Sequence, residues 1–359
     1  MRPTSATVRL ADIAGNYQLA DGLAPASQTI PVIKANAYGH GMLEIAKKLQ
    51  SMAPVFAVAL MEEAVQLRDA GIVKPILVLQ GINQPEDIAE AAARGFWLLL
   101  HHRQEIDWLL SAALPDPVSV WLKLDTGMHR LGFAPAALDQ LCIDLHSSAN
   151  VKKDMVLCTQ LGCADDLDDI MTNEQIKMIR SCSGKHGLAM SIANSAGIMH
   201  WPQSHAEWNR PGYMLYGNSP TDDSETGGHE LRPAMTMSSR IIAIRNLKAG
   251  EGVGYGFTWV AKRNSVIGTI AIGYGDGYPR HAPNGTPVLV NGKRVPLTGR
   301  VSMDAISVDL TDQQGVEVGD PVELWGQNLS VNELAGCAGT IGYEILAGLT
   351  GRVPLVYQS

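Results

Sequence analysis

Short apolar runs alternate with amphipathic stretches through the first two thirds of the chain. The apolar runs have the length of strands, and the stretches between them carry apolar residues at helical spacing. This alternation predicts βαβ units and a parallel sheet, and eight such runs favour a closed (β/α)8 barrel over an open doubly wound sheet. The predicted strands are residues 30–33, 55–60, 75–79, 96–100, 118–124, 155–161, 188–193 and 212–215, and helices are expected at 42–49, 62–70, 85–93 and 173–181.

The pattern changes after residues 217–228, a patch rich in Gly, Ser and Asp that predicts a linker or loop. Beyond it, β-rich runs replace the alternation of strand and helix. We therefore expect an α/β fold with a (β/α)8 barrel domain at residues 1–229 and a mainly β domain at residues 230–359. Residues 1–10 are candidates for pairing with the β domain.

Turn signals divide the β-rich runs of the last third of the chain. Asn-Gly between apolar runs predicts a hairpin, because both residues tolerate the positive φ that a tight turn requires. Such pairs are Asn284-Gly285 and Asn291-Gly292, and Ala249-Gly250 is a third turn signal. The runs lie at residues 235–244, 266–272, 287–290, 306–310 and 321–324, and two helices are expected near 330–335 and 343–349.

Composition and charge exclude several classes of function. Hydrophobic residues make up 46% of the 359 residues and charged residues 18%, which is ordinary for a globular protein with a large core. The net charge of −8 argues against non-specific binding to nucleic acid or to anionic membranes. We see no signal peptide and no apolar run of membrane-spanning length, and five cysteines at unrelated spacings fit reduced thiols better than disulfides or a zinc site. We expect a cytoplasmic protein without a metal.

The most unusual feature of the predicted barrel is a lysine, Lys34, at the end of its first strand. Catalytic groups in such barrels lie at the C-terminal ends of the strands, and the loops after the last two strands often hold phosphate. A desolvated lysine amine is a good nucleophile, although a lone lysine more often extends into water. Ser195 and the backbone amides near Gly212 and Tyr213 lie at the expected phosphate position. A helix N-cap is the ordinary role of such a serine. The combination of Ser195 and these amides with Lys34 instead predicts a pyridoxal 5′-phosphate (PLP) site.

Tyrosines among glycines mark the predicted β domain. Tyr255 lies in the segment GVGYG at residues 252–256, where small residues let the backbone approach a ligand or another chain closely. Tyr274 and Tyr278 lie in a similar cluster. Turn chemistry with surface aromatic residues is the ordinary explanation of such clusters.

Six segments, in order along essentially the whole chain, carry a specific likeness to a known family. The chain resembles the bacterial alanine racemases, and the segment around Lys34 is similar to the family's cofactor-lysine signature. The segments are KANAYGHG at residues 34–41, KLDTGMHRLG at 123–132, RPG at 210–212, VGYG at 253–256, GYGDG at 273–277 and GRVSMD at 299–304.

The resemblance implies a PLP-dependent enzyme that interconverts L- and D-alanine, either for peptidoglycan or for alanine catabolism. It implies a head-to-tail homodimer with shared active sites. Lys34 would bind the cofactor covalently and act as base on one face of the substrate, and Tyr255 of the partner subunit would act on the opposite face. Arg210 would contact the pyridine nitrogen of the cofactor.

The remaining site residues follow from the same resemblance. Arg130 would orient the substrate, and the backbone amide of Met303 of the partner subunit would hold the substrate carboxylate. In some members the lysine matching Lys123 is carbamylated and braces this arginine. The cofactor phosphate would be held by Tyr38, Ser195, Gly212, Tyr213 and Tyr343.

One position departs from the family pattern. Members typically have a histidine at the end of the sixth strand, where this chain has Gln160, which donates and accepts hydrogen bonds but cannot titrate. In the family this histidine links the tyrosine base to the arginine, so the departure concerns the tuning of Tyr255. The nearest alternative function is a serine or broad-specificity racemase on the same scaffold. A non-catalytic PLP-binding protein is disfavoured, because such barrels lack a β domain with a tyrosine for the partner.

Overall fold

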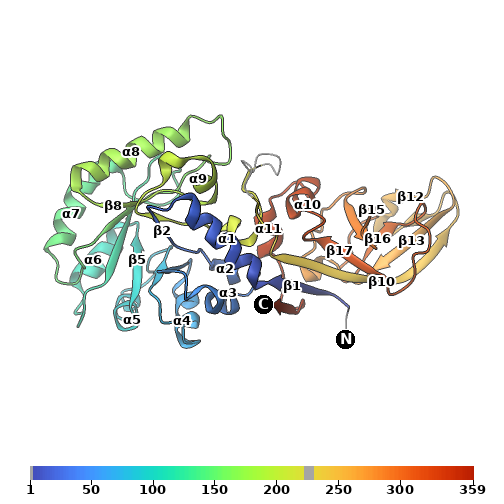
Figure 1. Ribbon diagram of the computed structural model, residues 1–359, viewed down its shortest axis with the longest axis horizontal. Coiled ribbons are helices and arrows are strands. Elements are labelled where there is room, and N and C mark those ends of the chain that lie inside the picture. The colour runs from blue at the N-terminus through green and yellow to red at the C-terminus, as the bar shows by residue number, and fades with distance from the viewer. Residues whose placement is uncertain (1–2, 222–229) are drawn as a thin grey trace.

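The computed structural model describes residues 3–221 and 230–359 and has two lobes (Figure 1). The barrel occupies one end of the molecule, and a β-rich lobe occupies the other. The predicted domain boundary at residues 229 and 230 and most of the predicted linker coincide with residues 222–229, which lie outside the described residues. In the described part of the chain, no helix has the length and apolar character needed to cross a membrane.

Eight parallel strands form the barrel, in the order β2-β9-β8-β7-β6-β5-β4-β3. A parallel bridge between Val32 and Ala57 joins the continuation of β2 to β3, and Ile33 N donates to Ala57 O at 2.8 Å, so the sheet closes on itself. The predicted (β/α)8 fold class is confirmed. The strands are β2 (Gln28–Thr29), β3 (Phe56–Val58), β4 (Ile76–Val78), β5 (Phe96–Leu100), β6 (Ser119–Lys123), β7 (Val156–Cys158), β8 (Ala189–Ser191) and β9 (Trp208–Asn209).

Helices connect these strands, and the four predicted stretches correspond to α3, α4, α5 and α8. The bounds of α3 are as predicted, those of α4 and α5 differ by one residue, and α8 ends five residues later than predicted. In α3, Met42, Ile45 and Leu49 lie on one buried face, at the spacing that a helix requires. The helices of this lobe are α1 (Leu10–Leu23), α2 (Lys34–Tyr38), α3 (Met42–Leu49), α4 (Met61–Asp69), α5 (Glu86–Arg94), α6 (Arg103–Ser111), α7 (Leu138–Ser147), α8 (Met171–His186) and α9 (Ser195–His200).

The prediction of an eighth strand at residues 212–215 is wrong. The eighth strand is the two-residue β9, and Tyr213–Tyr216 form a 3-10 turn. Asn209 ends this strand and Arg210 follows it, both buried, so the sequence offers no apolar run at this point. Beyond β9 the backbone still bonds to neighbouring segments, because Arg210 N donates to Ala193 O at 3.0 Å and Pro211 O accepts from Val32 N at 2.9 Å.

The second lobe is a mainly antiparallel sheet in the order β13-β16-β15-β14-β17-β10-β1-β18, with a further pairing of β13 and β10. The N-terminal strand β1 lies in this sheet, antiparallel to β10 and parallel to β18. The elements are β1 (Ser5–Arg9), β10 (Met235–Leu247), β13 (Ser265–Ile270), β14 (Pro287–Val290), β15 (Lys293–Thr298), β16 (Ile306–Asp309), β17 (Pro321–Trp325), β18 (Leu355–Gln358), the separate pair β11 (Gly252–Val253) and β12 (Trp259–Val260), and the helices α10 (Val331–Ala338) and α11 (Gly342–Ala347).

One of the two predicted Asn-Gly hairpins is confirmed. Asn291 and Gly292 join the antiparallel strands β14 and β15 with φ values of +50° and +74°. The hairpin prediction at Asn284 is wrong, because β13, the strand before this turn, does not pair with β14, the strand after it. The Asn284 side chain instead bonds to two other segments. It accepts from Gly299 N at 2.7 Å and donates to Thr258 O at 3.0 Å.

The expectation of a surface aromatic is also wrong for Tyr278, which is buried, whereas Tyr274 is exposed.

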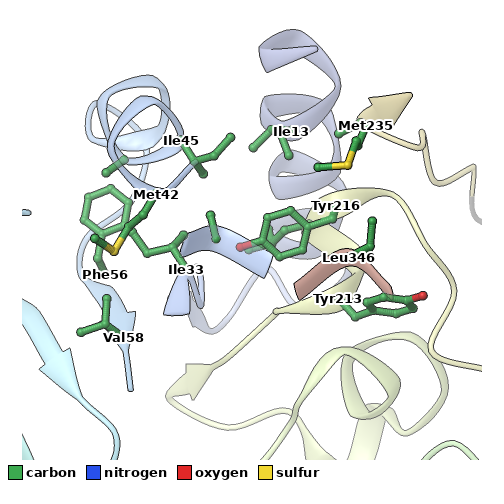
Figure 2. Packing of buried hydrophobic residues seen from close by; sticks show 14 of the residues in the cluster. Ile13, Ile33, Met42, Ile45, Phe56, Val58, Tyr213, Tyr216, Met235 and Leu346 are labelled. Atoms are coloured by element: carbon green, nitrogen blue, oxygen red, sulfur yellow. The ribbon is translucent and has the colours of Figure 1, made fainter. Parts of the chain in front are cut away.

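Apolar packing runs without a break from the barrel into the second lobe. Figure 2 shows Tyr216 within this region, with Ile13 of α1 and Leu346 of α11 around it. Tyr216 is fully buried, and its hydroxyl donates to Val32 O at 2.9 Å. At Gly39 a Cβ atom would collide with the carbonyl oxygen of Leu346, so α11 lies directly against this part of the barrel. Both lobes therefore support the segment that carries Lys34.

Candidate active site

A cavity of about 410 Å³ opens at the C-terminal ends of the barrel strands, where catalytic groups are expected. It brings together Lys34, Arg130 and Arg210 from the predicted site residues. Among the described residues, no group of three or more His, Cys, Asp or Glu side chains is placed to hold a metal ion. The lining residues with polar side chains are Lys34, Gln80, Lys123, Asp125, Arg130, Thr159, Gln160 and Arg210.

Lys34 begins a left-handed turn instead of ending a strand. Residues 35–38 all have φ between +50° and +54°, which costs L-residues about 1–2 kcal/mol each. Hydrogen bonds hold the turn, among them Gly39 N to Ala35 O at 3.1 Å and Met42 N to the Asn36 side chain at 2.9 Å. Such a conformation persists only where the surroundings determine it fully. The backbone of Lys34 is accordingly fixed at the rim of the cavity.

Arg210 is only 5% exposed, and neutral oxygens hold its guanidinium. Nη2 donates to Thr159 O at 2.7 Å and to the side-chain oxygen of Gln160 at 3.3 Å, and Nη1 donates to the Ser191 hydroxyl. Gln160 therefore lies where it can orient Arg210, although it cannot titrate as a histidine would.

A buried residue that the sequence did not single out supports this arrangement. Gln175 of α8 donates to Gln160 O at 3.0 Å and to the Thr126 hydroxyl at 3.1 Å, and it accepts from Gly162 N at 2.9 Å. Its side chain thus ties the loops after β6 and β7 together. A glutamine within an amphipathic helix gives no sequence signal for such a role.

Positive charge dominates the cavity and acts on both of its lysines. Burial lowers the pKa of Lys34 below its ordinary value, Arg130 and Arg210 lower it further, and Glu63 opposes them. Burial likewise lowers the pKa of Lys123 to about 8, with a contribution from the two arginines. Both amines therefore lose a proton more readily than a lysine in water, and the neutral amine is the form that acts as nucleophile or base.

A second group of predicted residues gathers where the loops after β8 and β9 meet. Ser195 is buried, and its hydroxyl accepts from Gly212 N at 3.0 Å and from Met214 N at 3.2 Å. The N-cap explanation of Ser195 is wrong, because Asn194 caps α9 by accepting from Gly197 N at 2.9 Å. Ser195 instead joins the two loops.

Three tyrosines belong to the same group: Tyr38, Tyr213 and Tyr343. Together with Ser195 and Gly212 they form what we call the wall. A Cβ atom at Gly212 would lie 2.8 Å from the hydroxyl of Tyr38, so only glycine allows the hydroxyl and the backbone to approach this closely. Tyr213 stacks on Tyr343 with 3.7 Å between ring centroids, and Tyr343 comes from α11 of the second lobe. Burial raises the pKa of Tyr38 to about 12 and also raises the pKa of Tyr343, so both hydroxyls stay protonated donors at neutral pH. Hydroxyl and backbone donors around a glycine fit a phosphate group.

Two predicted site residues lie elsewhere. Tyr255 is 69% exposed and Met303 is 51% exposed, and neither is among the described residues that line the cavity around Lys34. Tyr255 lies between β11 and β12, and Figure 1 shows β12 at the end of the molecule remote from the barrel. Within one chain, the structure does not bring these two residues to Lys34.

Comparison with known proteins identifies the family. Residues 8–220 match the family model described as alanine racemase, N-terminal domain, and residues 234–357 match alanine racemase, C-terminal domain. The alanine racemase of Vibrio cholerae is 46% identical over 361 residues and covers 99% of each chain. The crystal structure of biosynthetic alanine racemase from Pseudomonas aeruginosa matches with a TM-score of 0.96 at 45% identity, over 100% of both chains. The alanine racemase from Bartonella henselae with covalently bound pyridoxal phosphate matches with a TM-score of 0.90 at 29% identity, also over 100% of both chains. The chain therefore belongs to the alanine racemase family, as its sequence motifs indicated.

Proposed function

We propose that this racemase interconverts L- and D-alanine with PLP as cofactor, using Lys34 as one base and Tyr255 of the partner subunit as the other. The observation that carries the proposal is Lys34 itself. Its backbone is fixed in a left-handed turn, its amine lies in a cavity with Arg130 and Arg210, and burial lowers its pKa.

The residues of the cavity and of the adjoining wall fit PLP. Lys34 would hold the cofactor covalently, and Arg210 would face the pyridine nitrogen. When bound, PLP withdraws electrons from the substrate Cα and makes its proton removable. The phosphate would be held by Tyr38, Ser195, Gly212, Tyr213 and Tyr343.

Two bases follow from the stereochemistry of the substrate. The Cα–H bonds of L- and D-alanine point to opposite faces, so one base must remove a proton on one face while another returns a proton on the other. Lys34 can serve one face, since its lowered pKa makes the neutral amine accessible. A tyrosine serves as a base only where positive charge favours its deprotonated form, and Arg130 and Arg210 would supply that charge to Tyr255 of the partner subunit.

Arg210 limits the chemistry to proton exchange. A guanidinium does not give up its proton in a protein, so Arg210 would leave the pyridine nitrogen unprotonated. Its neutral acceptors, Thr159 O and Gln160, keep the cation in place without cancelling its charge. A less electron-deficient ring stabilises a carbanion less, which restrains transamination and decarboxylation.

A second copy of the chain is part of the proposal. Tyr255, Phe257 and Met303 are all more than half exposed, at 69%, 68% and 51%. A closed head-to-tail homodimer would cover these residues and give two equal sites. Met303 of the partner subunit would then hold the substrate carboxylate through its backbone amide, and Arg130 would orient the substrate.

Complementation between two inactive variants tests the shared site. Lys34→Ala and Tyr255→Phe chains, each inactive alone, are co-expressed with different tags, and the mixed dimers are isolated. Each mixed dimer holds one intact site and one doubly altered site, so it should show about half of the wild-type activity. A mixed dimer without activity would refute the sharing of sites, and full racemisation by Tyr255→Phe would refute the two-base mechanism.

The proposal extends to D-alanine supply for peptidoglycan in the cytoplasm. Two observations support it: the Pseudomonas aeruginosa relative is a biosynthetic alanine racemase, and the five cysteines of this chain form no disulfide. Growth of a D-alanine-requiring strain that carries the gene tests this role. Parallel assays with alanine and serine test the substrate, and faster turnover of serine would replace alanine in the proposal.

A further inference from the structure

A carboxylate on a neighbouring helix is bonded to the peptide that carries Lys34. Glu63 lies in the first turn of α4, and its Oε2 accepts from Ala59 N at 2.8 Å and from Leu60 N at 3.1 Å. These two bonds cap the helix to which Glu63 belongs. Its other oxygen, Oε1, reaches across to a different element and accepts from Ala35 N at 2.6 Å. Capping does not require this third bond.

The amide of Ala35 opens the left-handed turn. It belongs to the peptide unit that follows Lys34, and Ala35 itself has a φ of +51°. A residue with a Cβ adopts this conformation only when its surroundings enforce it. A short bond to a carboxylate is stronger than a bond between neutral groups, so Glu63 fixes the point from which the Lys34 side chain departs.

Glu63 also supplies negative charge near a lysine in a positive cavity. Three charged groups act on the pKa of Lys34: Arg130 on the loop after β6, Arg210 after β9 and Glu63 on α4. Lys123 and Asp125 line the same cavity. Burial and the two arginines lower the pKa of Lys34, whereas Glu63 raises it. Removal of this carboxylate therefore moves the amine further toward its neutral form.

We propose that Glu63 is a positioning residue for Lys34, which it serves both through the bond to Ala35 N and through its charge. The inference rests on the proposed function, because it assigns Glu63 a role only through the lysine that binds PLP and carries the proton. The carboxylate of Glu63 joins the loop after β3 to the turn after β2, so two segments of the barrel fix the position of Lys34.

The rate at which Lys34 captures added PLP reports both effects. The full-length chain is freed of cofactor and mixed with PLP over a range of pH, and borohydride then fixes the product for peptide mapping. The neutral amine attacks the aldehyde carbon and water leaves, so the pH midpoint of the rate follows the pKa of Lys34. Glu63→Gln removes the charge, and Glu62→Gln, at an exposed neighbouring position on α4, is the matched control.

We expect Glu63→Gln to shift the midpoint to lower pH by about half a unit or more, with no shift in Glu62→Gln. Glu63→Asp keeps the charge but is too short to reach Ala35 N, so it should keep the midpoint near the wild-type value while PLP capture slows at every pH. An unshifted midpoint in Glu63→Gln, or wild-type capture by Glu63→Asp, would overturn the inference. If the wild-type chain itself fails to bind PLP at Lys34, the proposed function fails instead, which keeps the two outcomes distinct.

Discussion

Gln160 offers the sharpest test of how the site is tuned. It replaces the family's usual histidine, and its side-chain oxygen accepts from Arg210 Nη2 at 3.3 Å, while the same nitrogen donates to Thr159 O at 2.7 Å. Gln160→Leu removes one acceptor and leaves the other. A hydrogen bond to a charged group is worth about 1.5–3 kcal/mol, and the long distance places this bond at the low end of the range. Carried entirely into the transition state, that loss lowers kcat/KM by roughly tenfold.

Gln160→His should instead preserve activity. An imidazole nitrogen can accept from Arg210, as the glutamine oxygen does. A second positive charge about 4 Å from the guanidinium would be disfavoured by about 4 kcal/mol at an effective dielectric constant of about 20. The pKa of the introduced histidine therefore falls well below its ordinary value, and the ring stays neutral at pH 7. In the proposed dimer its second ring nitrogen would donate toward Tyr255 of the partner subunit, which should shift the pH–rate limb assigned to that tyrosine.

The assay is kcat/KM in both directions across the neutral and alkaline pH range. Gln160→Leu is the control, because it tests the loss of the acceptor without adding a ring that can bond further. A shifted limb in Gln160→His with a uniform decrease in Gln160→Leu supports the linkage. If the profiles of both variants match the wild type in shape and height, Gln160 takes no part in tuning either base, and the reasoning from its contact with Arg210 is wrong.

Three further predictions concern groups around the site. Burial lowers the pKa of Lys123 to about 8, so part of its amine is neutral near pH 7 and should react with CO₂ to form a carbamate. We expect a carbamate signal in ¹³C NMR under labelled CO₂, and this signal should be absent in Lys123→Ala. Gly212→Ala would place a Cβ 2.8 Å from the Tyr38 hydroxyl, and we expect at least about tenfold weaker PLP binding by fluorescence titration, partly restored by Tyr38→Phe. Burial lowers the pKa of His40 from 6.5 to about 4, so the native state binds fewer protons than the unfolded state between these values. Stability should fall as the pH drops through that window, by about 3 kcal/mol, and His40→Phe should flatten this part of a urea-unfolding series.

Much of the fold could be predicted because its strands carry continuous apolar runs. β5 at Phe96–Leu100 is bounded as expected, and the strands around it differ only at their ends. The misplaced eighth strand shows where this signal stops. β9 is only two residues long, ends on the buried Asn209 and leads into Arg210, which lines the cavity, so no apolar run marks this strand in the sequence.

The chemistry of the site could be predicted from motifs, but its support could not. Lys34 was identifiable because a lysine is unusual directly after a buried apolar run, and Arg210 followed from the resemblance of its RPG segment to the family. Gln175 and Glu63 were not, since a glutamine or glutamate within an amphipathic helix is ordinarily exposed and solvated. Their roles depend on backbone amides and carbonyl groups of other segments, which three-dimensional packing alone brings within reach.

The second lobe supports the lysine of its own chain, a role separate from the contribution to a partner's site that we propose for it. Four consecutive residues in the left-handed region, 35–38, together cost about 4–8 kcal/mol, which local hydrogen bonds only partly offset. α11 lies against the end of this turn, where Gly39 leaves no room for a Cβ beside Leu346 O, and Tyr343 of the same helix completes the wall near Tyr38. The geometry of Lys34 thus depends on residues of both lobes, which lie far apart in the sequence. Because the lobe that would deliver Tyr255 to the partner also holds this turn in place, damage to its packing should impair cofactor capture and proton transfer together.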